Sequence, residues 1–159
     1  MEKKYFLFLA KFFAIFIVLH TLIYFVDLSW LQNSIAGFEA GLLNIPVQEQ
    51  FVQVNSDVFE VSQSCTGLIS SFILAAIVFS LKKPELKTKA VLFTLGSITL
   101  LLVNLVRVYL VLLAAQLYGL MAAHWLHVLS WFAMSALIIA LWFYLTANYL
   151  KIKSFQGFL

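Results

Sequence analysis

The chain has 159 residues and a mass of 18.1 kDa; 64% of its residues are hydrophobic, 11% are charged, and the formal net charge is +3. Soluble domains are about 45–50% apolar and about 25% charged, and a chain this small cannot enclose so much apolar surface in its own core. The composition therefore predicts one transmembrane domain over residues 1–159, all-α in class. It excludes a cytosolic enzyme, a nucleic-acid binder and a disordered tail.

Four stretches approach the length of about 20 apolar residues that a membrane-spanning helix needs. They cover about residues 5–26, 62–81, 90–117 and 125–150, and the second has the fewest apolar residues. The first stretch follows two lysines, as in a secretory signal peptide, but its apolar run is long and no A-x-A cleavage site follows it. The sequence thus predicts a four-span helical bundle in which the first helix is retained.

The lysines predict the orientation of the bundle. All nine lie on one side of the four-span arrangement: near the N-terminus, in the loop 82–89 and after residue 150. Because positive loops stay in the cytoplasm, we expect both termini and the loop 82–89 on the cytoplasmic side of the cell membrane. Anionic lipid headgroups are the expected neighbours of that loop. Five acids lie between the first two spans, so the segment 27–61 is expected on the extracytoplasmic side.

The first part of this outer segment has helical periodicity. Residues 29–44 repeat apolar side chains at helical spacing, with polar side chains between them: Leu31, Ile35, Phe38 and Leu42, separated by Gln32, Asn33 and Glu39. Such a pattern predicts an amphipathic helix that lies in the outer membrane interface. A re-entrant or spanning helix is the alternative.

The second part of the outer segment has the composition of β-structure. Val47 to Val54 and Asp57 to Val61 are rich in residues that favour strands, and Asn55-Ser56 is a suitable turn between them. The segment 27–64 is therefore predicted to contain a small β-hairpin after the interfacial helix.

The rare chemically active residues fall at one depth. Arg107 lies roughly 25 Å above the start of the third span at about 1.5 Å per residue, close to the outer surface of a core about 30 Å thick. Cys65 lies at the outer end of the second span, and His124 and His127 lie at the outer end of the fourth. Asn104 precedes Arg107 by three residues and shares its helix face.

Each of these residues has a structural explanation when taken alone. A single cysteine is often a small apolar residue, an arginine in a span can extend to the interface, and histidines are common there. An arginine and an asparagine on one face inside a span are difficult to explain by packing. A thiol, an imidazole and a guanidinium together suit acyl transfer through a thioester. One cysteine without a C-x-x-C pair predicts no metal and no cofactor.

Three short motifs resemble those of the exosortase/archaeosortase family. The cysteine motif is Cys65-Thr66-Gly67-Leu68, preceded by Ile45-Pro46-Val47 and Phe59-Glu60-Val61. The second motif is Asn104-Leu105-Val106-Arg107, and the third contains His127 with Ser130-Trp131 behind it. The motifs occur in the family's order over roughly residues 40–135, and the chain resembles a compact member of the family.

The resemblance implies a membrane-embedded cysteine protease or transpeptidase that acts at the outer face. Its substrates would be exported proteins with a C-terminal sorting signal, made of a short motif, a transmembrane helix and a basic cluster. Cys65 would be the nucleophile, Arg107 would activate the thiol or bind the oxyanion, and His127 would transfer protons. His124 is a rival for that last role. A non-enzymatic membrane protein, such as an assembly or transporter subunit, or a pseudo-enzyme, is the alternative.

Overall fold

The computed structural model describes residues 2–150, and their contacts divide them into two compact units. Unit 1 contains the residues up to Val26, Ile69–Leu100 and the residues from Ser135 onward, whereas unit 2 contains Asp27–Leu68 and Leu101–Met134. Two long helices, α4 (Leu86–Tyr118) and α5 (Leu120–Leu150), contribute residues to both units. The single transmembrane domain and its predicted span boundaries stay a prediction.

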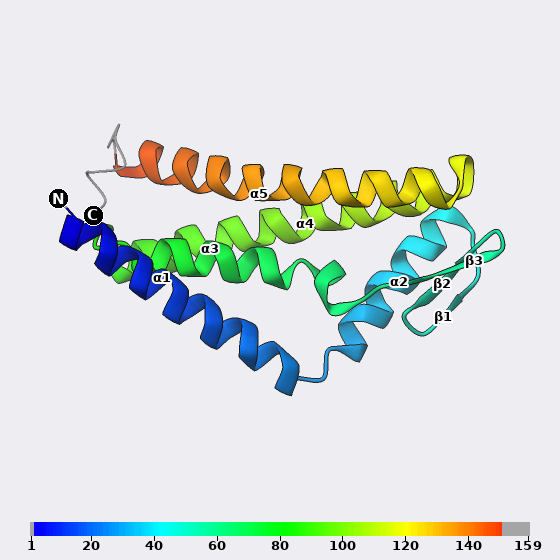
Figure 1. The fold of residues 1–159 in the computed structure, drawn as a ribbon, viewed down its shortest axis with the longest axis horizontal. Helices are drawn as coiled ribbons and strands as arrows, with labels where there is room; N and C mark the ends of the chain where they lie inside the picture. Colours follow the sequence, from blue (N-terminus) through cyan, green and yellow to red (C-terminus); the bar gives the residue numbers. More distant parts are fainter. Residues whose placement is uncertain (1, 151–159) are drawn as a thin grey trace. The chain divides into compact units, whose positions relative to one another are not determined.

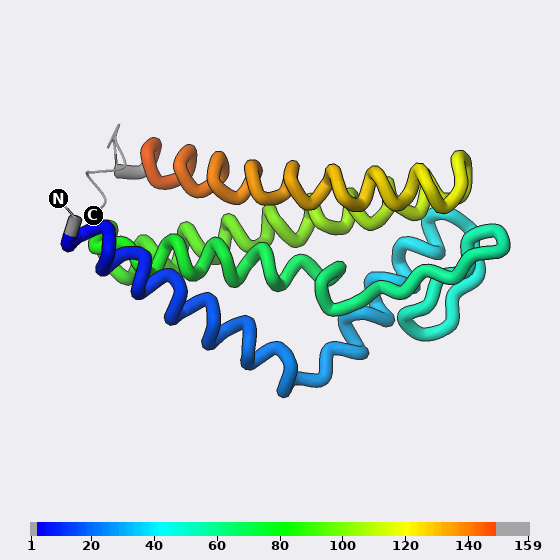
Figure 2. Tube along the Cα trace, in the orientation of Figure 1, coloured from blue at the N-terminus to red at the C-terminus, as the bar shows by residue number. Residues whose placement is uncertain are grey.

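Three of the described helices are long and apolar enough to cross a membrane. The first of these candidate spans covers Lys3–Phe25 and combines α1 (Glu2–Leu22) with the 3-10 turn η1 (Ile23–Phe25). The other two lie in α4 and α5 (Figure 1). A single residue, Gly119, separates α4 from α5 (Figure 2). Its φ is +82°, and its N–H donates to the carbonyl of Ala115 at 3.0 Å. This glycine ends α4, and α5 begins at the next residue.

The predicted four-span bundle is not confirmed, because the stretch 62–81 does not form one helix. Its regular part is α3 (Leu68–Ser80), which has 13 residues and is therefore about 20 Å long, shorter than the membrane core of about 30 Å. The residues before it form a separate 3-10 turn, η2 (Gln63–Thr66), and Gly67 with φ +82° ends that turn.

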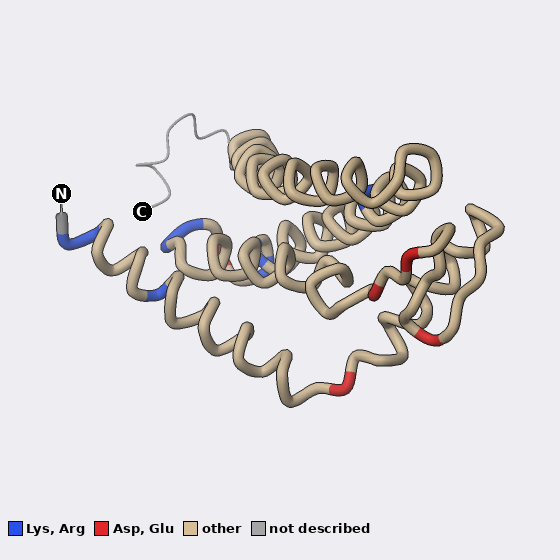
Figure 3. Tube along the Cα trace, turned by 45° about the vertical axis from the view of Figure 1, so that its right-hand side comes forward, with Lys and Arg blue, Asp and Glu red and all other residues tan. Residues whose placement is uncertain are grey.

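Unit 1 contains the close packing of α3 on the first half of α4. A Cβ on Gly96 would come within 2.5 Å of the Leu74 side chain, so the glycine gives the two helices room to approach. The Nζ of Lys89 donates to the carbonyl of Leu81, just after the end of α3. All described lysines belong to unit 1, and Lys151 and Lys153 lie outside the described residues (Figure 3).

Unit 2 contains the predicted outer helix, α2 (Ser29–Leu43). The backbone N–H and the hydroxyl of Ser29 both donate to the Asp27 carboxylate, at 2.9 and 2.6 Å, which ties down the start of the helix. These bonds lower the pKa of the exposed Asp27 carboxyl. Asn44 ends the helix in the left-handed conformation (φ 52°). Its interfacial or spanning position stays a prediction.

The face of α2 that packs inside unit 2 differs from the predicted apolar stripe. Ile35 is buried as expected, but Phe38 and Leu42 are each 54% exposed. Ala36 and Ala40 take their place, because small side chains let the helix approach the rest of the unit. Glu39, predicted on the polar face, is 0% exposed.

The predicted hairpin is present, but the sheet has a third strand. β1 (Val47–Gln48), β2 (Phe51–Val54) and β3 (Asp57–Glu60) form an antiparallel sheet in the order β1-β2-β3. A turn at residues 49–50, where Glu49 has φ +55°, divides the stretch predicted as one strand. β2 and β3 pair with Val52 opposite Phe59 and Val54 opposite Asp57.

One hydrophobic core joins the sheet, α2 and the helices of unit 2. Val52 and Val54 point inward from β2 and pack with buried side chains of α2, α4 and α5, among them Ile35, Ala36, Ala40, Val108, Leu112, Ala115 and Ala123. The amide of Gln32 donates to the carbonyl of Val61 at 3.0 Å, which fixes the chain leaving β3 against α2. The segment that follows β3 is η2, so this core positions Cys65.

Candidate functional site

Cys65 lies in the 3-10 turn η2, immediately after the sheet. Its N–H bonds the carbonyl of Ser62 at 2.9 Å, and its side chain is partly buried. The hydroxyl of Ser62 donates to the sulfur at 3.7 Å. Thr66, the next residue, is 1% exposed and its hydroxyl donates to the carbonyl of Gln63 at 2.7 Å. The turn is therefore held by its own backbone and hydroxyls, and the thiol is left at its surface.

Gly67 allows the cysteine turn to lie directly against α4. Its φ of +82° is unfavourable for residues with a Cβ. A Cβ there would also lie 3.1 Å from the Cβ of Asn104 and 3.1 Å from the Leu101 side chain. Both the backbone conformation and the close contact require glycine, which explains the glycine two residues after the cysteine.

Asn104 connects the cysteine turn to the arginine. Its side-chain amide donates to the carbonyl of Cys65 at 2.6 Å, and its oxygen accepts from the guanidinium of Arg107 at 3.3 Å. Asn104 is 2% exposed, so both bonds lie away from water. The three-residue spacing of Asn104 and Arg107 on one turn of α4 makes this bridge possible.

The guanidinium of Arg107 is buried (7% exposed) and is held from several sides. Besides Asn104, its Nε donates to the hydroxyl of Ser130 at 2.8 Å, and its Nη2 lies 3.2 Å from Nδ1 of His127. Its carbon lies 5.5 Å from the ring centre of Trp131, in cation–π range. The side chain of Cys65 interacts electrostatically with the guanidinium and lines the same cavity.

Arg107 is the only lysine or arginine in unit 2, which contains five acids. The polar partners of its guanidinium in the described chain are an amide, a hydroxyl, an imidazole and a thiol, and none is a carboxylate. A buried arginine normally pairs with an acid, because an uncompensated buried charge is costly. The absence of such a pair leaves the positive charge available to a thiolate or to an anionic reaction intermediate.

His127 is half-buried in the second turn of α5, and hydrogen-bond donors approach both of its ring nitrogens. The indole N–H of Trp131 points to Nε2 at 3.1 Å, and Arg107 faces Nδ1 at 3.2 Å. A neutral imidazole carries one N–H, so it can accept only one of these two bonds at a time. One contact must therefore open before the ring can take up a proton.

His124 occupies a different environment from His127. It is exposed, and its ring contacts Trp125 edge-on at a centroid distance of 6.2 Å. Of the two rivals for proton transfer, His127 is thus the one that contacts Arg107. Ser130 and Trp131, which the sequence indicated only as part of the third motif, follow His127 by three and four residues. That helical spacing was the signal that they would contact it.

Cys65, Arg107 and His127 line one cavity of about 150 Å³. Phe59, Glu60 and Val61, at the end of the sheet, form another part of its wall, and the rest is apolar side chains of α4: Val108, Val111 and Leu112. The cavity thus brings a thiol, a guanidinium and an imidazole to one mostly apolar space, beside an extended strand.

These observations define the class: a membrane protein with a cysteine, an arginine and a histidine around one cavity. The family model described as "Transmembrane exosortase (Exosortase_EpsH)" matches residues 3–144. The chain therefore belongs to the transmembrane exosortase family, as the motifs predicted. The comparisons with curated proteins and with solved structures gave no match. At the level of the family, membership supports a membrane-embedded cysteine peptidase or transpeptidase.

Proposed function

We propose that the protein cleaves the C-terminal sorting signal of exported proteins at the outer face of the cell membrane and conserves the acyl group as a thioester on Cys65. The observation that carries this proposal is the shared cavity of Cys65, Arg107 and His127. Its substrates are exported proteins that end in a short motif, a transmembrane helix and a basic cluster. The new C-terminus passes either to an acceptor in the membrane or at the surface, or to water.

The proposed reaction begins with proton transfer from the Cys65 thiol to His127. The sulfur then attacks the scissile carbonyl, an S–C bond forms, and the carbonyl electrons move to the oxygen. Arg107 stabilises first the thiolate and then this oxyanion. The C–N bond breaks as His127 gives its proton to the leaving amine. The acceptor, or water, loses its proton to His127 as it attacks the thioester, and the proton returns to sulfur when the S–C bond breaks.

The position of β3 supports an extended path for the substrate. β3 is an edge strand of the sheet, and its last residues line the cavity. An extended peptide that adds to an exposed edge gains main-chain hydrogen bonds without dependence on sequence. A photocrosslinker at Val58, which is 66% exposed on β3, should capture the substrate. The matched position is the exposed Gln48 on β1, at the other edge, where no capture is expected.

The proposed orientation follows the separation of charges in the sequence. The described lysines belong to unit 1, and five acids belong to unit 2, which also contains the cysteine site. Under the positive-inside rule the lysine-bearing ends are cytoplasmic, and the site faces outward. A membrane-impermeant thiol reagent applied to intact cells should therefore label Cys65, the only cysteine of the chain.

The decisive experiment compares the C-terminal peptides of exported membrane proteins in host cells with and without the chain. Cleaved C-termini should appear with the wild-type chain and disappear with Cys65→Ala, Arg107→Ala and His127→Ala. His124→Ala, on the same helix but exposed, should leave processing in place. A hydroxylamine-sensitive adduct on Cys65 would identify the thioester. Processing that is the same with and without the chain would instead favour a non-enzymatic membrane protein or a pseudo-enzyme, and chain-dependent processing that persists in Cys65→Ala would exclude Cys65 as the nucleophile.

A further inference from the structure

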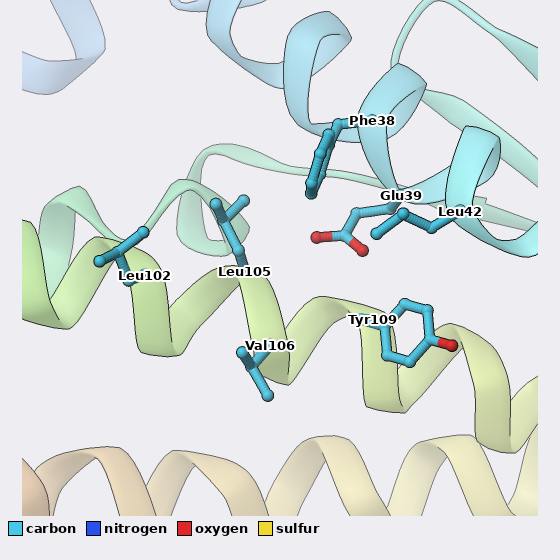
Figure 4. Close-up of a pocket in the computed structure, with 7 residues that line it drawn as sticks. All are labelled: Phe38, Glu39, Leu42, Leu102, Leu105, Val106 and Tyr109. Carbon is cyan, nitrogen blue, oxygen red and sulfur yellow. The ribbon is translucent and has the colours of Figure 1, made fainter.

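Glu39 is a buried acid outside the cysteine site. It lies on α2, its side chain is 0% exposed, and neither carboxyl oxygen has a hydrogen-bond partner. Figure 4 shows the carboxyl pointing from α2 toward α4, into a cavity of about 450 Å³. The volume lies within the range of about 300–1,000 Å³ that is typical of small-molecule sites.

Unit 2 offers this carboxyl no counter-ion. Its only cation, Arg107, is engaged with Cys65, Asn104, Ser130 and His127. The other residues that line the cavity are apolar, except for Tyr109, which carries a hydroxyl: Phe38, Leu42, Leu102, Leu105 and Val106. Burial of an unpaired carboxylate in such a place is unfavourable and favours the protonated group. Burial accordingly raises the pKa of Glu39 to about 7.

The rim of the cavity is apolar and open to the surroundings. Phe38 and Leu42 on α2 are each 54% exposed, and Leu102 and Val106 on α4 are 59% and 57% exposed. In a chain with three candidate membrane spans, side chains of this kind contact lipid chains. The cavity therefore presents an apolar entrance and a single buried acid to the bilayer.

We propose that the cavity between α2 and α4 binds a membrane lipid with a primary ammonium headgroup, which pairs with Glu39 while the lipid's acyl chain lies along the apolar rim. A primary ammonium has three N–H donors, enough to serve both orphaned oxygens of the carboxylate. A quaternary ammonium carries charge but has no N–H, and an anionic headgroup would repel the acid. The site is distinct from Cys65, so this inference does not depend on the proposed reaction.

The test reconstitutes the full chain in phosphatidylcholine nanodiscs with a minor fraction of phosphatidylethanolamine, and measures by native mass spectrometry the lipid that stays bound. Wild type should retain phosphatidylethanolamine in preference to phosphatidylcholine and phosphatidylglycerol of the same acyl chains. In Glu39→Gln this retention should fall by about tenfold or more, because a charge-assisted hydrogen bond is lost. Glu49→Gln, an exposed acid of the same segment, should behave as wild type.

A second variant addresses the case in which Glu39→Gln does not fold. Val106→Phe fills the cavity from the exposed face of α4 and should also reduce retention, at an unchanged melting temperature. The proposal would be overturned if the folded variants retained phosphatidylethanolamine as well as wild type does. It would also be overturned if wild type retained phosphatidylcholine as well as phosphatidylethanolamine. Dodecylamine, added separately, is the free-amine probe. If the protein retained dodecylamine but not phosphatidylethanolamine, the cavity would be a site for a free amine instead of a lipid, and the proposal would also be overturned. Cys65→Ala should bind lipid as wild type, whether or not the proposed reaction is correct.

Discussion

The side-chain amide of Asn104 donates to the backbone carbonyl of Cys65 over 2.6 Å, across the contact between the cysteine turn and α4. The same side chain accepts from Arg107 at 3.3 Å. One residue thus fixes the position of the cysteine and the orientation of the arginine relative to each other. Asn104 does not line the cavity with them. In the proposed reaction, Asn104 would therefore be a positioning residue.

We expect Asn104→Ala to reduce the alkylation rate of Cys65 and substrate processing by about 10- to 100-fold, because a buried carbonyl left without its donor costs about 1–3 kcal/mol and the turn would shift to recover a partner. Stopped alkylation time courses on the reconstituted protein measure the first effect. Gln53→Ala, an exposed amide on β2, is the control. Unchanged rates in Asn104→Ala would contradict a positioning role.

Gly67→Ala should destabilise the protein by about 1–3 kcal/mol and lower processing, because alanine is strained at φ +82° and its Cβ would press on Asn104. A Cβ added at Gly37 of α2 would meet no neighbouring side chain within 4 Å, so Gly37→Ala should be neutral or stabilising. Thermal unfolding of both variants in detergent makes the comparison. Similar melting temperatures for the two would refute the close approach of the cysteine turn to α4.

Trp131→Phe removes the indole N–H that faces Nε2 of His127 but keeps an aromatic ring over Arg107. With one donor gone, we expect the neutral ring to carry its proton on Nε2, while Nδ1 accepts from Arg107. ¹⁵N NMR of histidine-labelled protein distinguishes the two tautomers. Trp125→Phe, beside His124, should leave the His127 signals as they are. If Trp131→Phe also leaves them unchanged, the indole does not determine the tautomer.

Arg107→Ala should slow the alkylation of Cys65 near neutral pH by about tenfold or more, since the adjacent positive charge that stabilises the thiolate is lost. Arg107→Lys should recover part of the rate, because it restores the charge but not the planar fork that reaches Ser130 and His127. A pH series of alkylation rates for the three proteins, with His124→Ala as control, gives the result. A rate that does not depend on residue 107 would make Cys65 a packing residue.

Burial raises the pKa of Glu39 from its ordinary value of 4.5 to about 7. Between these two values the folded protein holds a proton that the unfolded chain has released. The free energy of unfolding should therefore fall as the pH rises from 4.5 to about 7, and Glu39 should contribute no further change above that.

Glu39→Gln cannot lose a proton, so its melting temperature should exceed that of wild type by an amount that grows across this pH window and then stays constant. The melting temperatures should be measured in bilayers of phosphatidylcholine alone, which supply no primary ammonium to pair with Glu39. Tyr109 is the other titratable residue among those that line the cavity, and Tyr109→Phe is the matched control. A constant difference between wild type and Glu39→Gln at all pH values would mean that the carboxyl titrates as an exposed one.

The sequence by itself determined the membrane class, the helical periodicity of residues 29–43, the hairpin turn at Asn55-Ser56 and the identity of the family. These features depend on local pattern: the length of apolar runs, turn residues and motif order. The apolar run of residues 62–81 is equally local, but the single helix that it predicted does not form. A single Gly67, whose left-handed conformation accompanies its close contact with α4, ends the turn and leaves α3 short.

Only the tertiary structure decided which histidine contacts Arg107 and that Glu39 is buried. Two histidines three residues apart on one helix cannot be distinguished by their spacing. In the fold, His127 contacts Arg107, whereas the ring of His124 contacts Trp125. The local pattern placed Glu39 on a polar face, whereas in the fold it is buried and shares a cavity with residues of α4 more than sixty positions away along the chain. Contacts between segments distant in sequence determine which side chains are buried and which residues they contact. The hydrophobic pattern along a single helix does not contain this information.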